Sequence, residues 1–257
     1  MKKDLFNLSK EIIIVTGASG LLGSEFVKIL LQYGAKVVKI DNKIKTNYKS
    51  KNISIKADVT SKESLQKALK EIKSIFGEPT GLINCAAINT LPNASNSDNS
   101  FEKYSLEDYE NTMSVNVKGV FLSCQIFGSE MAKKKKGSII NLSSIYGILS
   151  PDHSIYQSKS KYFKPIDYSI SKSAVINMTK YLAVYWAKKN VRVNNLILGG
   201  VKQNQDKNFI DRYNKKVPLG RLANKDEFNT AIIYLISPSS SYTTGSNILI
   251  DGGWTSW

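Results

Sequence analysis

The stretch Ile12-Ile13-Ile14-Val15-Thr16-Gly17-Ala18-Ser19-Gly20-Leu21-Leu22-Gly23 passes from an apolar run through three glycines into a segment with helical spacing. Four consecutive apolar residues predict a strand buried on both faces, as a parallel sheet requires. Glycine permits positive φ angles and close approach of a pyrophosphate, and the start of a helix attracts anions. The stretch therefore predicts a dinucleotide-phosphate loop between the first strand and the first helix.

Apolar runs alternate with amphipathic stretches along all 257 residues, which predicts a parallel sheet covered by helices. We expect an α/β fold with one doubly wound Rossmann domain, residues 1–257, and a substrate-side insertion around residues 150–166. Its sheet should be seven-stranded and mostly parallel, with helices on both faces. The expected strands are 12–15, 35–41, 53–57, 81–87, 138–144, 191–198 and 247–250, and the expected helices are 22–31, 65–76, 106–131, 168–189 and 226–235.

Composition excludes several classes of protein. The hydrophobic share of 42% and the charged share of 22% are typical of a globular chain rather than a disordered one. No apolar run is long enough to span a bilayer, and the start at Met1 lacks the apolar run of a signal peptide, so we expect a cytoplasmic location and no membrane partner. Cys85 and Cys124 lack disulfide-framework or zinc-site spacing, so no metal is expected.

The net charge of +15 raises the question of nucleic-acid binding. Most lysines are dispersed, and the one dense run, Lys133 to Lys136, stands at a helix end where cations suit the dipole. We therefore expect no nucleic-acid partner. The positive charge is instead a hint of an anionic small-molecule substrate.

Asp41 ends the second expected strand, 18 residues after Gly23. A carboxylate at about this distance from the glycine turn binds the adenosine ribose of a dinucleotide and repels a 2′-phosphate. The sequence therefore favours NAD over NADP. Lys43 and Lys45 lie close by and would weaken this preference.

The stretch Tyr168-Ser169-Ile170-Ser171-Lys172 places a phenol and an ammonium at positions i and i+4 of a helix, on one face. A free phenol has a pKa of about 10, and a nearby cation lowers it by favouring the phenolate. Ser143 and Ser144 end the preceding strand. These residues predict a unit that transfers protons beside a bound nicotinamide.

These motifs together resemble the short-chain dehydrogenase/reductase family over nearly the whole chain. The matching motifs are Thr16 to Gly23, Asp58-Val59, Asn84-Cys85-Ala86-Ala87, Asn116, Ser143 to Gly147, Tyr168 with Lys172, Pro218 to Arg221, and Asp251-Gly252-Gly253. The resemblance implies direct hydride transfer between a secondary alcohol carbon and a nicotinamide, and assembly as a homo-oligomer, a tetramer or dimer.

The resemblance also implies a role for individual residues. Tyr168 would be the general acid/base, Lys172 would lower its pKa and hold the nicotinamide ribose, Ser144 would orient the substrate oxygen, and Asn116 would support a water relay. Cofactor-binding candidates are Gly17, Ser19, Gly20, Leu21, Leu22, Gly23, Asp41, Asp58, Val59, Asn84, Ala86, Tyr168, Lys172, Gly200 and Val201. Substrate-binding candidates are Ser144, Tyr146, His153 and Tyr156.

The sequence departs from the family pattern at three places. Gly17, Gly20 and Gly23 have the spacing of extended members that act on nucleotide sugars, and Gly199-Gly200 stands where Pro-Gly is common. Tyr168 follows Ser144 by 24 positions, about double the family's usual gap. We expect the extra segment, from Pro151 to Lys164, to border the substrate pocket.

The sequence leads to one main functional hypothesis and two alternatives. The main one is an NAD-preferring oxidoreductase acting on a sugar or sugar-phosphate substrate, since the chain resembles bacterial oxidoreductases of surface-sugar and flagellin-glycan biosynthesis. The lysines at 159, 161, 164, 202 and 207 would face an acidic or phosphorylated sugar. The alternatives are a nucleotide-sugar epimerase or dehydratase that retains NAD, and a non-catalytic dinucleotide-binding regulator.

Overall fold

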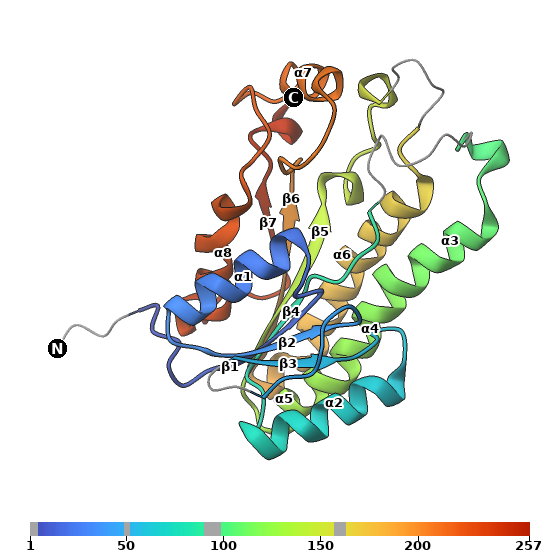
Figure 1. Cartoon of the computed structure of the whole chain (residues 1–257). Coiled ribbons are helices and arrows are strands. Elements are labelled where there is room, and N and C mark those ends of the chain that lie inside the picture. The colour runs from blue at the N-terminus through green and yellow to red at the C-terminus, as the bar shows by residue number, and fades with distance from the viewer. Residues whose placement is uncertain (1–4, 49–51, 90–98, 157–162) are drawn as a thin grey trace.

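A computed structural model describes residues 5–48, 52–89, 99–156 and 163–257 (Figure 1). Its centre is a seven-stranded sheet in the order β3-β2-β1-β4-β5-β6-β7, and every pair of neighbouring strands is parallel. The strands are β1 Ile12–Thr16, β2 Lys36–Asp41, β3 Asn52–Lys56, β4 Gly81–Asn84, β5 Gly137–Ser144, β6 Val191–Leu198 and β7 Asn247–Ile250. The predicted doubly wound α/β architecture is confirmed, with each expected strand within a few residues of its place.

Helices cover both faces of the sheet (Figure 1). On one face lie α1 Leu21–Gln32 and α8 Asn229–Ile236, and on the other lie α2 Lys62–Ile75, α3 Leu106–Met113, α4 Gly119–Ser123, α5 Ser129–Lys133 and α6 Ile166–Trp186. Ile13 of β1 belongs to the first apolar layer and Ile14 to the second, because successive side chains of a strand point to opposite faces. Among the helices in the described ranges, none has the length and apolar character needed to cross a bilayer.

The helical segment expected over residues 106–131 is present and runs to Lys133, but two π turns interrupt it. They cover Ser114–Lys118, between α3 and α4, and Cys124–Gly128, between α4 and α5. Such turns insert an extra residue into a helix and are common beside functional sites. The first of them carries Asn116, whose side chain is buried.

A helix that the sequence analysis did not anticipate, α7 Lys207–Asn214, lies beyond the carboxyl end of β6 (Figure 1). The Asp206 side chain accepts a hydrogen bond from the Phe209 backbone N–H at 2.9 Å and caps it. Phe209 and Tyr213, one turn apart, are both buried in an apolar cluster that also contains Trp254. Ile210 also packs against this cluster, but a helix of eight residues is too short to produce a clear periodic pattern.

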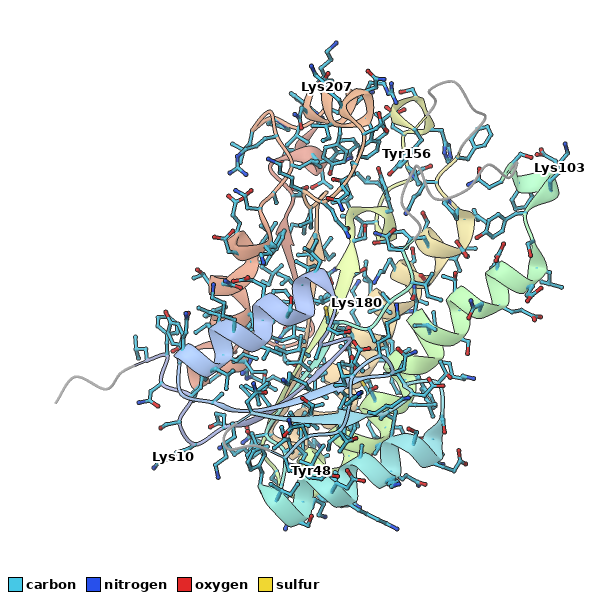
Figure 2. All side chains as sticks on the ribbon, in the orientation of Figure 1. Lys10, Tyr48, Lys103, Tyr156, Lys180 and Lys207 are labelled. Atoms are coloured by element: carbon cyan, nitrogen blue, oxygen red, sulfur yellow. The ribbon has the colours of Figure 1, made fainter. Side chains whose placement is uncertain are left out.

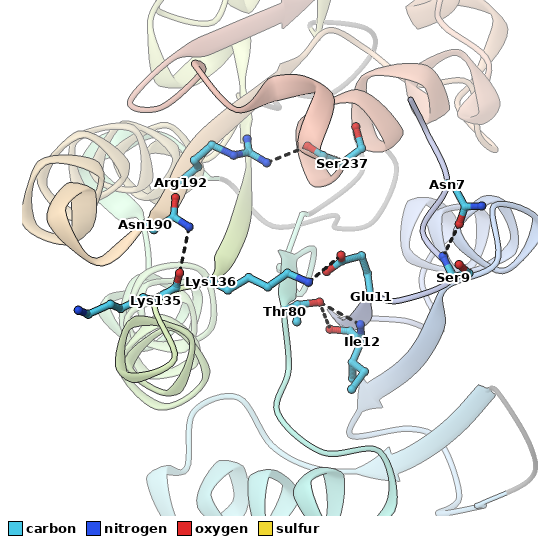
Figure 3. Close-up of polar contacts among 10 residues, drawn as sticks. All are labelled: Asn7, Ser9, Glu11, Ile12, Thr80, Lys135, Lys136, Asn190, Arg192 and Ser237. Carbon is cyan, nitrogen blue, oxygen red and sulfur yellow. Dashed lines mark hydrogen bonds and ion pairs between the residues drawn. The ribbon is translucent and has the colours of Figure 1, made fainter. Parts of the chain in front are cut away.

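Polar contacts link the chain segments at the amino-terminal ends of the strands (Figure 3). Thr80 Oγ1 accepts a hydrogen bond from the Ile12 N–H at 3.0 Å, and Lys136 Nζ lies 2.9 Å from Glu11 Oε1. Lys133 pairs in the same way with Glu130. Three members of the Lys133 to Lys136 run, Lys133, Lys134 and Lys136, are therefore engaged in ion pairs within the chain.

Candidate active site

A cavity of about 390 Å³ lies at the carboxyl ends of β1, β4, β5 and β6. The strand order changes direction between β1 and β4, and in open parallel sheets ligands bind at such a switch point. Among the predicted site residues, those that line this cavity are Gly17, Gly20, Leu21, Leu22, Ser144, Tyr146, Tyr156, Tyr168, Lys172, Gly200 and Val201. The tertiary structure thus brings residues from distant parts of the chain to one place.

The glycine turn packs tightly between β1 and α1. Gly17 has a φ of +64°, and a Cβ atom on it would lie 2.6 Å from Ala86 Cα. A Cβ atom on Gly23 would lie 2.2 Å from the Gly17 carbonyl oxygen. No side chain caps the start of α1 at Gly20, and its first turn holds no acidic residue. This positive helix end at the cavity wall fits the diphosphate of a dinucleotide.

Asp41 stands at the end of β2, next to the glycine turn. Its Oδ2 accepts hydrogen bonds from the Ser19 backbone N–H at 3.0 Å and from Ser19 Oγ at 2.6 Å, and its Oδ1 accepts one from the Lys43 N–H at 2.9 Å. Burial opposes the carboxylate charge, but these bonds outweigh burial and lower the pKa of Asp41. A fixed negative charge therefore stands beside the loop, where an adenosine ribose would be recognised.

Asp58 and Val59, the other predicted contacts on the adenosine side, follow β3. Asp58 Oδ1 accepts hydrogen bonds from the Thr60 N–H and hydroxyl, both at 2.8 Å. Val59 is buried and lies so close to Gly119 that a Cβ atom there would approach Val59 Cγ2 to 2.9 Å. Both side chains thus have structural contacts of their own, and neither is part of the cavity lining described above.

Ser144, Tyr168 and Lys172 meet at the cavity floor. Ser144 is the last residue of β5, and α6 carries Tyr168 and Lys172 on the face that packs along β5. The Ser144 hydroxyl is hydrogen-bonded to the Tyr168 phenol. Lys172 Nζ donates to the Leu142 carbonyl oxygen at 3.1 Å and lies 5.6 Å from the centroid of the Tyr168 ring.

Burial shifts the pKa values of Tyr168 and Lys172 in this group. Burial raises the pKa of Tyr168, and the hydrogen bond from Ser144 opposes that rise without cancelling it. Burial also lowers the pKa of Lys172 to about 8. The net effect of these protein surroundings on the pKa of Tyr168 is therefore upward. Additional positive charge in the cavity would be needed for a phenolate at neutral pH.

Asn116 connects β4 to α6 without lining the cavity. Its Oδ1 accepts from the Ile88 N–H at 2.7 Å, and its Nδ2 donates to the Ile88 carbonyl at 3.0 Å and to Ser171 Oγ at 3.1 Å. The amide thus fixes the chain that leaves β4 against the residue preceding Lys172. In this structure it positions the floor of the site.

Asn84, predicted to bind cofactor, directs its side chain into the interior instead. Its Nδ2 donates to Asn141 Oδ1 at 2.8 Å, Asn141 Nδ2 donates to Thr179 Oγ1 at 2.8 Å, and Thr179 Oγ1 donates to Asn195 Oδ1 at 3.0 Å. Asn195 in turn donates to Asn247 Oδ1 at 3.0 Å. We call Asn84, Asn141, Thr179, Asn195 and Asn247 the amide row. It joins β4, β5, β6 and β7 to α6.

Aromatic side chains form the wall opposite the glycine turn. The Tyr156 hydroxyl donates to the Tyr146 hydroxyl at 2.8 Å, and burial raises the pKa of both. Phe209 and Tyr213 of α7 complete this wall, and the Gly200 N–H donates to the Tyr213 hydroxyl at 2.6 Å. Figure 2 shows Tyr156 at the end of the molecule where α7 carries Lys207. Sequence reasoning missed the α7 residues, because one i, i+4 pair in a helix of eight residues is not a clear periodic pattern.

His153 is not brought to this cavity. Its ring packs edge-on against Phe163, with centroids 5.4 Å apart, and both line a neighbouring cavity of about 510 Å³. Asn99 and Lys164 also line that neighbouring cavity. The prediction that His153 faces the same space as Ser144 and Tyr168 is therefore not supported by its position.

The five lysines expected to face an anionic sugar differ in position. Residues 159 and 161 lie outside the described ranges, and Lys202 and Lys207 are exposed without lining the cavity. Lys164 is buried, with 7% of its surface exposed, and lines the cavity that contains Tyr168. In the chain that the structure describes, no group of three or more histidine, cysteine or acidic side chains has the arrangement of a metal site.

Comparisons with known proteins find relatives that match nearly the whole chain. A family model described as enoyl-(acyl carrier protein) reductase matches residues 18–255. The NAD-dependent glycerol dehydrogenase of Listeria innocua is 31% identical to this chain, and the match covers 97% of this chain and 96% of that protein. Post-translational flagellin modification protein A of Campylobacter coli is 26% identical to this chain, and the match covers 96% of this chain and 99% of that protein.

Solved structures also include a match over nearly the whole chain. A short chain dehydrogenase from Leptospira borgpetersenii, solved with bound NAD⁺, superposes with a TM-score of 0.88 and 34% identity, and the match covers 99% of this chain and 96% of that one. The family match extends over most of the chain, and the relatives correspond to this chain nearly from end to end. The chain belongs to the short-chain dehydrogenase/reductase family and is an oxidoreductase enzyme.

Proposed function

We propose that this enzyme interconverts a secondary alcohol and a ketone on a small sugar or polyol, with a nicotinamide dinucleotide as the redox partner. The observation that carries the proposal is the meeting of Ser144, Tyr168 and Lys172 in the cavity that the glycine turn also lines. The Listeria innocua relative, named as a glycerol dehydrogenase, supports a polyol as the type of substrate. The glycine turn, Gly200 and Val201 are the residues that would hold the dinucleotide.

The residues of the chain would divide the chemistry as follows. The hydride acceptor or donor would be a nicotinamide ring held in this cavity, and its oxidised form would also bring a positive charge. The phenolate form of Tyr168 would take the proton of the alcohol during oxidation, and the phenol form would return it to the ketone oxygen during reduction. The Ser144 hydroxyl holds the same oxygen and the phenol together, and Lys172, anchored on the Leu142 carbonyl, adds positive charge beside Tyr168.

We propose that NAD is preferred over NADP. Asp41 supports this preference, because its carboxylate is held in the charged form beside the glycine turn and would repel a 2′-phosphate. The NAD⁺ complex of the Leptospira borgpetersenii relative is consistent with it. The ratio of kcat/KM values for NAD and NADP measures the preference.

A role in glycan biosynthesis and assembly into a homo-oligomer complete the proposal. The similarity to the flagellin modification protein of Campylobacter coli supports the first. Exposed apolar residues near the end of α6, namely Tyr181, Val184 and Tyr185, support the second, because water-exposed apolar patches of this kind mark protein contacts.

The variant Tyr168→Phe tests the proposed reaction. We expect the rate of alcohol oxidation to fall by about 10²–10⁴-fold, since the proton acceptor is lost, while binding of NAD changes little. The oxidation rate is measured as NADH formation at an assay wavelength of 340 nm, and NAD binding is measured by calorimetric titration. Tyr181→Phe, which removes an exposed hydroxyl from the same helix, serves as the control. Full activity of Tyr168→Phe would contradict the assignment.

A further inference from the structure

Lys164 is a buried cation in the catalytic cavity whose position the reaction described above does not explain. Its Nζ lies 4.2 Å from the centroid of the Tyr168 ring, closer than the 5.6 Å that separates Lys172 Nζ from the same point. The residue belongs to the extra segment that lengthens the interval between Ser144 and Tyr168. That segment therefore delivers a second ammonium to the substrate side of the catalytic tyrosine.

Several contacts hold Lys164 in place. Its Nζ donates a hydrogen bond to Asn89 Oδ1, on the chain that leaves β4. The preceding residue, Phe163, donates its N–H to Asn99 Oδ1 at 2.9 Å and accepts a bond from the Asn99 amide through its carbonyl. Because the flanking backbone is fixed in this way, the ammonium is pre-positioned in the cavity rather than free to sample solvent.

The charge of the cavity lining is wholly positive among the residues that the structure describes. The charged members are Lys172, which the proposed reaction already uses, and Lys164. Burial lowers the pKa of Lys164 to about 7, while Asp167 raises it and Lys172 lowers it. An anion bound next to Lys164 would offset the cost of burying its charge. Amide oxygens such as that of Asn89 offset this cost less completely.

We infer that Lys164 recognises an anionic oxygen group, a carboxylate or a phosphate, on the sugar alcohol or ketone that the enzyme converts. This inference rests on the proposed function, because it names the substrate class of the same cavity. Tyr146 and Tyr156 hydroxyls, on the facing wall, are suited to the neutral hydroxyls of such a substrate. Lys164 would act as a specificity-determining residue, and Ser144 and Tyr168 would still carry the reaction.

The test uses three substrates that share a six-carbon chain: D-glucitol, D-gluconate and D-glucitol 6-phosphate. For the wild-type enzyme with NAD, we expect kcat/KM for at least one anionic member to exceed that for glucitol by about 10- to 100-fold, the range of one charge-assisted hydrogen bond. In Lys164→Met, the ratio of kcat/KM for the anionic substrate to kcat/KM for glucitol should fall to about one, whatever the change in the glucitol value itself. Lys164→Arg should retain most of the wild-type advantage, and comparison of gluconate with the phosphate identifies the anionic group.

Lys202→Met is the matched control, because it removes one exposed lysine that does not line the cavity. Its preference for the anionic substrates should equal that of the wild type. Calorimetric titration of the NADH-loaded enzyme with D-gluconate and D-glucitol gives a second readout that needs no turnover. Tighter binding of gluconate should disappear in Lys164→Met.

The outcomes separate this inference from the proposed function. A wild-type enzyme that prefers glucitol or binds gluconate no more tightly overturns the role of Lys164, and so does an anion preference that survives in Lys164→Met. If instead gluconate binds in a Lys164-dependent manner but no sugar alcohol or ketone is converted, the proposed reaction fails while the anion site stands.

Discussion

At the scale of single residues, the chemistry depends on how one buried phenol is made to exchange a proton. Burial raises the pKa of Tyr168, and the hydrogen bond from Ser144 opposes the rise. Lys172 is itself desolvated, with a pKa lowered to about 8, so its charge alone does not offset the burial of Tyr168. The positive ring of an oxidised nicotinamide would supply the missing charge, which couples proton transfer to cofactor binding.

The variant Ser144→Ala should shift the pH dependence of the reaction. Because its hydrogen bond lowers the pKa of Tyr168, removing the hydroxyl raises that pKa. Alcohol oxidation needs the phenolate, so its rising limb should move to higher pH, and kcat should fall by about 10²–10³-fold. Ketone reduction needs the protonated phenol and should keep its shape near neutral pH.

The measurement is kcat against pH in both directions. Ser173→Ala is the control, because Ser173 is exposed and its hydroxyl donates to the Gly147 carbonyl at 2.8 Å. The prediction fails if the rising limb of the pH profile for alcohol oxidation lies at the same pH in Ser144→Ala and in the wild type. Ser144 would then have no effect on the pKa of Tyr168.

At the scale of elements, α6 connects the catalytic group to the sheet. Its first turns carry Tyr168 and Lys172, and two turns beyond Lys172 the buried Thr179 joins the amide row. Thr179 Oγ1 accepts from Asn141 on β5 and donates to Asn195 on β6. One helix therefore fixes the position of the proton donor relative to Ser144 at the end of β5.

Replacing Thr179 by valine should destabilise the protein by about 1–3 kcal/mol, since the buried amides of Asn141 and Asn195 each lose a partner while the side-chain volume is kept. Urea unfolding followed by circular dichroism measures the change. Thr179→Ser, which keeps the hydroxyl, should lose less. Equal stability of Thr179→Val and the wild type would mean that the amide row contributes nothing to folding.

At the scale of the whole molecule, the carboxyl-terminal end of α6 exposes a group of large apolar side chains. Tyr181, Val184 and Tyr185 are 68%, 80% and 65% exposed, and the rings of Tyr181 and Tyr185 stack with centroids 6.0 Å apart. Met178 and Leu182 pack against the core, whereas Tyr185 faces solvent.

We predict that Val184→Asp weakens assembly, because it would bury an unpaired charge in the contact between two copies of this group. Light scattering coupled to size-exclusion chromatography should give a lower mass for the variant than for the wild type. Ile75→Asp, on the partly exposed end of α2, is the control and should leave the mass unchanged. A monomeric wild type, or an unchanged mass for Val184→Asp, would refute the assignment of this group.

The sequence by itself determined the features that depend on neighbours along the chain. The buried β1 run, the glycine turn and the Tyr168–Lys172 pair all follow from local spacing, because strand and helix periodicity set which side chains share a face. The direction of Asp41 toward the glycine turn follows from the register of two adjacent parallel strands.

Only the tertiary structure decided which residues meet across elements. It placed Asn84 in the amide row, His153 in the neighbouring cavity and Lys164 against the Tyr168 ring. It also formed α7 from a segment with too few apolar residues to show periodicity. These outcomes depend on how segments far apart in the sequence pack at one sheet edge, and no local pattern encodes the burial and hydrogen-bond partners that arise there.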